Sequence, residues 1–257
     1  MITLYDKIFN NINFDKIAII EKKKEYNYYA LYRNCETIIE YFKNNFGYNK
    51  KLCISIPNSY ESVVLFLACA KLNYKLFPLN SNISKSNFKN YINKYDFDII
   101  ISDRMVSNYK VGKQNNRFYF KKNFIIKLLK NNKNFNPPSK IKSQKINEEP
   151  YLIILSSGST GDPKPIVLSQ NNKYLRSFYA GNLYKFGKNE KIILPYELDH
   201  SVGQRLMFMS LIHNGTLIIM NNFNEEMWYK NCIDYKISFS ILVSTHIKKM
   251  FLKKINF

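Results

Sequence analysis

Residues 155–164 read LSSGSTGDPK and follow a short apolar run at residues 151–155. The length of that run and its β-branched residues predict a buried strand. Glycines tolerate positive φ, so successive backbone N–H groups in the stretch that follows can converge into a concave nest that binds anions. Serine and threonine hydroxyls add donors there, and Lys164 adds a positive charge. The composition therefore predicts a phosphate-binding loop, although its spacing is not that of the Walker loop. The alternative is a serine- and glycine-rich turn that only joins two strands.

The overall composition suggests a globular protein with an excess of basic residues. The 257 residues are 46% hydrophobic, which is enough to bury a sizeable core as one large domain or two smaller lobes. The formal net charge of +20 would suit a nucleic acid or an anionic membrane as partner. However, the over-used residue types (Lys, Asn, Ile, Tyr and Phe) can all be encoded by A and T alone. Because the basic residues are spread widely and no nucleic-acid motif accompanies them, we attribute the charge to compositional drift and predict no nucleic-acid partner.

Cysteine usage and hydrophobic run lengths bear on the compartment. The four cysteines form no C-x-x-C pair and no metal-like cluster, which predicts free thiols in a reduced, cytoplasmic protein and argues against zinc. The apolar run at residues 63–70 is too short to span a bilayer. Asp6 interrupts any apolar start, so no signal peptide is expected. These features predict a soluble cytoplasmic protein without a membrane span.

The first hundred residues alternate between strand and helix patterns. We expect a strand at residues 17–20, and a helix over residues 31–46 that Gly47 ends. A strand at 52–56, a helix that Ser59 caps and Asn73 ends, and a strand at 75–79 form a βαβ unit with a parallel sheet. A further helix around residues 88–95 precedes a strand at 98–102.

The pattern resumes after the predicted loop. We expect a strand at 166–168, a helix that Ser169 caps and that ends near Gly181, strands at 191–194, 216–220 and 238–243, and helices at 202–213 and 225–236. This alternation predicts an α/β protein with mostly parallel sheets flanked by helices on both faces. Ligands bind such sheets beyond the carboxyl ends of the strands, where the loop at 156–164 falls.

The chain divides into three segments on composition. Residues 104–147 contain no acidic residue and many basic ones, and a pair of prolines at 137–138 is typical of a linker. We predict a first α/β lobe at 1–103, a basic connector at 104–147 whose aromatic stretches are partly buried, and a second α/β lobe at 148–257 that carries the phosphate-binding loop.

Residues 156–164 resemble the T-S-G-[ST]-T-G-x-P-K-G signature of the adenylate-forming superfamily, which includes acyl-CoA synthetases, peptide-synthetase adenylation domains and luciferases. One departure is Pro165, where the family has glycine. A second segment resembles the family's V-A-I-x-x-P-N-S-x-E…P-L-N stretch. The residues in register there are Ile54, Pro57, Asn58, Ser59, Glu61, Lys71, Pro78, Leu79 and Asn80.

The resemblance implies a function and a set of site residues. The family activates a carboxylic acid (fatty, aryl or amino acid) with ATP as an acyl-adenylate, and then transfers the acyl group to CoA or to the phosphopantetheine of a carrier protein. Mg²⁺ would accompany ATP, with Thr160 near it. Through the resemblance, the residues that would bind ATP phosphates are Ser156, Ser157, Gly158, Ser159, Thr160, Gly161 and Lys164.

The second implied site is at His200. His200-Ser201-Val202-Gly203 is similar to the family's P-x-x-H-x-x-G element, with a longer spacing from Pro195. The resemblance makes His200 a candidate catalytic residue beside the acyl pocket; the alternative is a histidine that only caps a helix, and Asp199 could also be a simple cap. We assign neither His213 nor His246 to catalysis, and the absence of G-x-S-x-G argues against a hydrolase.

The resemblance covers nearly all of the chain but only the first part of a family enzyme. The later family motifs and the C-terminal lid domain are not found in residues 1–257. We therefore expect a truncated N-terminal part that is poorly active alone. The alternatives are a non-catalytic remnant or binding module that retains the fold and, less favoured, a basic protein that binds nucleic acid.

Overall fold

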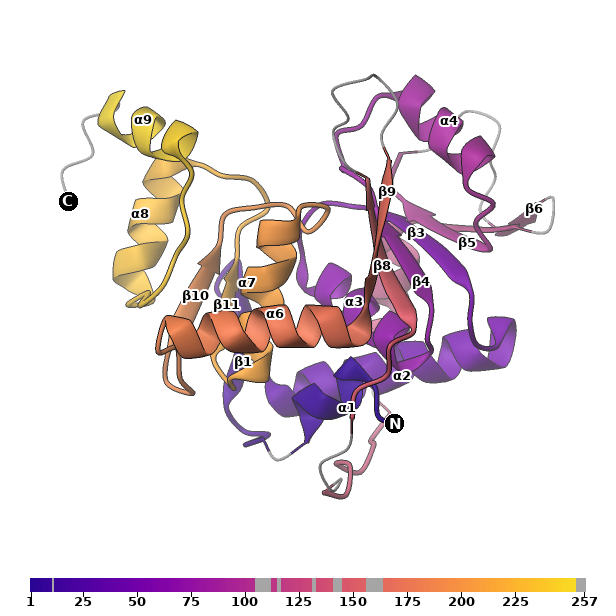
Figure 1. Ribbon diagram of the computed structural model, residues 1–257, viewed down its shortest axis with the longest axis horizontal. Coiled ribbons are helices and arrows are strands. Elements are labelled where there is room, and N and C mark those ends of the chain that lie inside the picture. The colour runs from indigo at the N-terminus through magenta and orange to yellow at the C-terminus, as the bar shows by residue number, and fades with distance from the viewer. Residues whose placement is uncertain are drawn as a thin grey trace.

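Two β-sheets with helices between and outside them make up the chain (Figure 1). The computed structural model describes residues 1–10, 12–104, 112–114, 117–130, 133–140, 145–155 and 164–252. The larger sheet has the strand order β6-β7-β5-β3-β4-β8-β9. Five central strands run parallel, and the edge strands β6 and β9 are antiparallel to their neighbours. Its strands are β3 (Lys51–Ser55), β4 (Lys75–Pro78), β5 (Ile99–Ser102), β6 (Gly112–Gln114), β7 (Arg117–Phe120), β8 (Pro150–Leu155) and β9 (Pro165–Ser169).

The smaller sheet has the order β10-β11-β1-β2. Strands β10, β11 and β1 are parallel, and β2 returns antiparallel to β1. Its strands are β1 (Ile17–Glu21), β2 (Lys24–Asn27), β10 (Lys191–Leu194) and β11 (Thr216–Ile219). The helices are α1 (Leu4–Phe9), α2 (Tyr28–Phe46), α3 (Tyr60–Lys71), α4 (Lys85–Lys94), α5 (Lys122–Leu129), α6 (Gln170–Leu183), α7 (Ser201–Ile212), α8 (Glu225–Asp234) and α9 (Ser244–Leu252).

The hydrophobic core is layered because successive strand residues point to opposite faces. On β3, Leu52 and Ile54 join the main core, in which residues of α1, α2, α3 and α7 lie between the two sheets. Cys53 points the other way, into a second cluster with Phe88 and Ile92 of α4. The outer face of the smaller sheet packs against Trp228 of α8. The α/β class with helices on both faces of the sheets, predicted from the sequence, is therefore confirmed.

Local signals in the βαβ unit are confirmed. The Ser59 side chain accepts from the backbone of Ser62 and forms a capping box at the start of α3. Asn73 after α3 has φ 54°, and Gly47, the C-cap of α2, has φ 79°. Both residues therefore have a positive φ at the point where a helix ends.

Other predictions differ from the structure. The strand predicted at 238–243 is wrong, because only one isolated bridge, Ile192 to Phe239, joins this segment to β10. Six described elements had no counterpart in the sequence analysis: α1, β2, β6, β7, α5 and α9. Helix α1 and the three strands are too short for a periodic signal to stand out.

The sheets do not follow the division of the chain into 1–103, 104–147 and 148–257. The larger sheet takes strands from all three segments, and the smaller one takes strands from the first and third. Within the basic connector, β7 pairs with β5, and Ile125 of α5 is fully buried. Tyr119 and Phe120 are buried and Phe118 and Phe124 are half-buried, which confirms the partial burial predicted for the connector's aromatic stretches. The division into two lobes and a connector stays a prediction. Among the described helices, none combines the length and the apolar character that crossing a bilayer requires.

Candidate functional site

The predicted phosphate-binding loop connects β8 to β9. These strands pair antiparallel up to Leu155 and Pro165, so residues 156–163 leave β8 at its carboxyl end. Lys164 is exposed and comes directly before β9. Strand β8 runs parallel to β4. The loop therefore begins on the same side of the sheet as the residues that follow β3 and β4, where the carboxyl ends of these strands lie. The other predicted phosphate ligands lie outside the described residues: Ser156, Ser157, Gly158, Ser159, Thr160 and Gly161.

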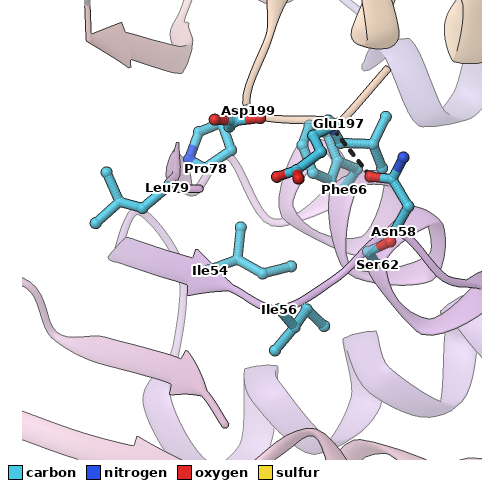
Figure 2. Close-up of a pocket in the computed structure, with 10 residues that line it drawn as sticks. Ile54, Ile56, Asn58, Ser62, Phe66, Pro78, Leu79, Glu197 and Asp199 are labelled. Carbon is cyan, nitrogen blue, oxygen red and sulfur yellow. Dashed lines mark hydrogen bonds between the residues drawn. The ribbon is translucent and has the colours of Figure 1, made fainter. Parts of the chain in front are cut away.

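Asn58, just after β3, ties the two sheets together at this edge. Its Nδ2 donates to the carbonyl of Tyr196 over 2.7 Å. Its Oδ1 accepts from the backbone N–H of Leu198 over 3.0 Å (Figure 2). Tyr196 and Leu198 belong to the segment that follows β10, and Asn58 is buried. A single amide therefore holds the segment before His200 against the end of β3. The sequence had Asn58 in register with a family motif, but it gave no sign of this contact.

His200 lies at the N-cap of α7, at the carboxyl end of the smaller sheet. Its side chain is 66% exposed, makes no capping hydrogen bond, and has Nε2 3.9 Å from Asp199 Oδ1. The capping alternative for the His200 side chain is therefore wrong, and Asp199 precedes the cap position. The imidazole is therefore mostly exposed to solvent.

Gly203 explains the glycine in the H-x-x-G spacing. A Cβ at this position would lie 2.4 Å from the carbonyl oxygen of Glu197 and 3.1 Å from that of Tyr196, so the backbone of the preceding segment packs directly on α7. One residue on, the buried side chain of Gln204 donates to the carbonyl of Leu198 over 2.8 Å. These two contacts fix the segment that carries His200.

Two carboxylates flank the same segment. Burial, and next the nearby charge of Asp199, raise the pKa of Glu197. Burial also raises the pKa of Asp199, while His200 and a hydrogen bond with Asn80 act in the opposite direction. Sequence reasoning missed Glu197 altogether, because nothing in the chain order shows that the ends of β4 and β10 meet here.

Below these carboxylates lies a small cavity of about 10 Å³ (Figure 2). This is about the smallest volume that holds one water molecule. A cavity of this volume is too small for a substrate. It is a packing gap under the site, lined by apolar side chains and a few polar ones. The residues that line it are Ile54, Ile56, Asn58, Ser62, Phe66, Pro78, Leu79, Glu197, Leu198 and Asp199.

The other two histidines have structural surroundings. His213 is the C-cap of α7 and its Nε2 lies 3.1 Å from the carbonyl of Phe178; burial lowers its pKa. The ring of His246 stacks on Phe223 with centroids 3.9 Å apart, and burial lowers its pKa as well. Among the described residues, no group of three or more His, Cys, Asp or Glu side chains could hold a metal ion.

Comparison with known proteins identifies the class. The profile of the AMP-binding enzyme family matches residues 9–256. The chain therefore belongs to the AMP-binding enzyme family, and the resemblance seen at residues 156–164 is confirmed. The solved structure of apo MatB from Rhodopseudomonas palustris superimposes with a TM-score of 0.81 at 15% identity, covering 97% of this chain and 51% of that one. The N-terminal subdomain of Klebsiella oxytoca NpsA, bound to 3-hydroxybenzoyl-AMSN, gives a TM-score of 0.79 at 18% identity, with 98% and 62% covered.

Curated relatives point to the same family. A 2-succinylbenzoate–CoA ligase of Staphylococcus epidermidis is 22% identical over 92% of this chain and 47% of its own length. A luciferin 4-monooxygenase of Nipponoluciola cruciata is 33% identical over 38% of this chain and 18% of its own length. The chain spans about half the length of the ligases it matches.

Proposed function

We propose that this chain belongs to an enzyme that activates a carboxylic acid with ATP. In that reaction a carboxylate oxygen attacks the α-phosphorus, the bond to the bridging oxygen breaks, and pyrophosphate leaves with an acyl-adenylate formed. A thiol of CoA or of a carrier-protein phosphopantetheine then attacks the acyl carbonyl, and AMP leaves. Family membership supports this proposal, as do the names of two relatives: the 2-succinylbenzoate–CoA ligase and a D-alanine–D-alanyl carrier protein ligase of Lacticaseibacillus paracasei, 33% identical over 32% of this chain.

The observation that carries the proposal is the family's phosphate-loop signature at the carboxyl end of β8. Within it we assign Ser156, Ser157, Gly158, Ser159 and Gly161 to the ATP phosphates, with Thr160 and Lys164. Backbone amides and a lysine charge would oppose the charge on the β- and γ-phosphates.

Mg²⁺ fits this site as a companion of ATP. The described residues offer no cluster of metal ligands, so the ion would arrive on the nucleotide, with the Thr160 hydroxyl beside it. When bound, Mg²⁺ spreads the charge of the phosphates as two anions meet. The chain's own part is to hold the phosphates and to place the acid.

His200 is our candidate for placing the acid. It is exposed at the start of α7, and the contacts of Asn58, Gly203 and Gln204 fix the backbone that carries it. An imidazole can donate a hydrogen bond to a carboxylate. Which acid is activated depends on pocket residues that we do not assign.

We also propose a cytoplasmic location. All four cysteines are free, and Cys35, Cys53 and Cys69 are buried. This usage is typical of proteins in a reducing compartment.

Acid-dependent exchange of labelled pyrophosphate into ATP tests the proposal. The complete enzyme should exchange with one class in a panel of fatty, aryl and amino acids. Residues 1–257 alone should exchange slowly, because they correspond to about half of the relatives. In the complete enzyme, Thr160→Ala and Lys164→Ala should each reduce the rate by about 10²-fold, as loss of a transition-state donor does. If both variants kept the full rate, the role of the loop would be wrong; if no acid supported exchange, the chain would be better described as a non-catalytic binding module.

A further inference from the structure

A second cavity lies among strand β2 and helices α2, α3 and α5. Its volume is about 370 Å³, within the range of small-molecule sites in proteins. It shares no lining residue with the loop after β8 or with the segment before His200. The residues that line it are Lys24, Tyr26, Ala30, Arg33, Asn34, Tyr60, Glu61, Ile126, Leu129 and Lys130.

The lining is strongly basic. Lys24 of β2, Arg33 of α2 and Lys130 at the end of α5 face one cavity. The single carboxylate in the lining, Glu61, is already paired with Lys122, with Glu61 Oε2 3.2 Å from Lys122 Nζ. Three cations therefore share the cavity with one carboxylate that has another partner, and an anion placed there would be attracted by all three.

Arg33 also has an unused donor. Its Nε is buried and has no hydrogen-bond partner among the described residues. Leaving such a group unpaired destabilises the fold, and more so when the group is charged. Because Arg33 lines the cavity, its guanidinium group can pair with an anion placed there, and guanidinium groups match carboxylate and phosphate oxygens.

The aromatic wall of the cavity is rigid. The rings of Tyr26 and Tyr60 stack with centroids 3.6 Å apart and planes within 8°. Lys24 Nζ lies 4.9 Å from the centroid of the Tyr26 ring. The Tyr60 hydroxyl accepts from Asn34 Nδ2 over 2.9 Å, and the Tyr60 N–H donates to Glu21 Oε2 over 3.0 Å. The two stacked rings are therefore already in place before a ligand arrives, which lowers the entropy that binding must overcome.

We propose that this cavity binds a small organic oxyanion, one that carries a phosphate or a carboxylate group. Arg33 would contact the anionic group, and Lys24 and Lys130 would hold it from either side. The apolar side chains of Ile126 and Leu129 would cover the rest of the molecule. The volume limits the ligand to roughly nucleotide size or smaller, so the site is not a groove for a nucleic-acid duplex. This proposal stands apart from the phosphate-binding loop, since neither set of residues depends on the other.

NMR titration of the folded chain tests the proposal. Inorganic phosphate, AMP and benzoate are each titrated in a low-chloride buffer while the Arg33 Nε–H signal is followed. We expect a saturable shift of that signal with at least one probe. Response to phosphate and AMP, but not to benzoate, assigns the site to phosphate groups; the reverse assigns it to carboxylates.

Matched variants locate the binding. The variants are compared through the backbone N–H signals of Ile126 and Leu129, which also line the cavity, because Arg33→Gln has no Nε–H. Arg33→Gln should weaken binding at least tenfold, and Lys24→Gln should weaken it severalfold. Lys24 is exposed, so this variant should retain the fold. Lys127→Gln removes the same charge from an exposed position on α5 outside the cavity and should leave binding unchanged. Lys164→Gln should also leave this binding unchanged, which separates the cavity from the loop. No saturable shift with any probe would overturn the proposal, as would equal affinities for the Arg33, Lys24 and Lys127 variants.

Discussion

Helices α3 and α6 are both packed against the core, yet they distribute polar and apolar residues in opposite ways. In α3, every residue except Glu61 and Lys71 is buried, and nearly all of the buried ones are apolar. In α6, the buried residues are Gln170, Lys173, Ser177 and Gly181. The exposed face of α6 carries Leu175, Tyr179 and Leu183, which are 37%, 63% and 77% exposed. The core at α3 is therefore held by apolar burial, and α6 is held partly by hydrogen bonds.

Two neighbouring positions on the buried face of α6 also differ. Gln170 is fully satisfied: its Oε1 accepts from the N–H of Leu4 over 2.7 Å, and its Nε2 donates to the carbonyl of Ala70 and to Asn73 Oδ1. One turn further on, Lys173 is 1% exposed and its Nζ has no partner among the described residues. A buried amide with all its bonds made stabilises the packing, whereas a buried ammonium without a partner destabilises it. We expect stability to be concentrated around α3 and to be reduced at Lys173.

The largest expected effect is at the centre of α3. Phe66→Ala should lower the free energy of unfolding by about 3–5 kcal/mol, because it removes a fully buried ring and leaves a cavity between the two sheets. Urea denaturation followed by circular dichroism measures the change. A loss below about 1 kcal/mol would show that α3 is not the main source of stability.

At Lys173 we expect a gain in stability that depends on pH. Burial, and next the charges of Arg176 and Arg205, lower the pKa of Lys173 to about 7 from 10.5. Between these pH values the unfolded chain binds more protons than the folded one, so the stability of the native protein rises with pH through this window. Lys173→Met should therefore stabilise the fold by on the order of 3 kcal/mol at pH 6, and the gain should shrink towards pH 10. Urea midpoints at pH 6, 8 and 9.5 give the profile; a difference independent of pH would contradict a buried, titrating ammonium.

The helix caps should affect both helices alike. Ser59 before α3 and Ser169 before α6 each form a capping box. Ser59→Ala and Ser169→Ala should each cost about 1 kcal/mol, since a cap satisfies local backbone donors whatever the helix packs against. Thermal denaturation of the two variants makes the comparison. If one substitution had no effect, the cap at that helix would not form in solution.

The smallest effect is expected on the exposed face of α6. Tyr179→Gln and Leu183→Gln should change the free energy of unfolding by less than about 0.5 kcal/mol, because both side chains already face solvent. Urea denaturation should be combined with sedimentation velocity. A loss above about 1 kcal/mol together with a change in association state would show that this face is covered in solution.

Features set by neighbouring residues were predictable from the sequence. These features depend on a few adjacent residues: the caps at Ser59 and Ser169, the helix ends at Gly47 and Asn73, and the phosphate-loop signature. Features set by distant residues were not. The segment at 238–243 has the composition of a strand, but it forms a single bridge because pairing depends on what lies beside it. A lysine is normally expected at the surface, and only the packing of α6 against α7 shows that Lys173 is buried.

The candidate site divides in the same way. The sequence pointed to His200 and to Lys164 through their motifs. It could not show that Asn58 hydrogen-bonds the segment before His200, or that Glu197 and Asp199 become partly buried beside Asn80. Those contacts depend on how the ends of β3, β4 and β10 come together, which is a property of both sheets at once.

Calorimetric titration of Mg·ATP into residues 1–257 tests the phosphate-binding loop most directly. The Arg33→Gln background removes the cavity next to α5 as a competing anion site. In that background we predict saturable binding that weakens about tenfold or more on Lys164→Ala, since a charge-assisted hydrogen bond is worth about 1.5–3 kcal/mol, and that stays unchanged on Lys127→Ala. Equal affinity for the Lys164 and Lys127 variants would contradict the assignment of residues 156–164 to ATP phosphates.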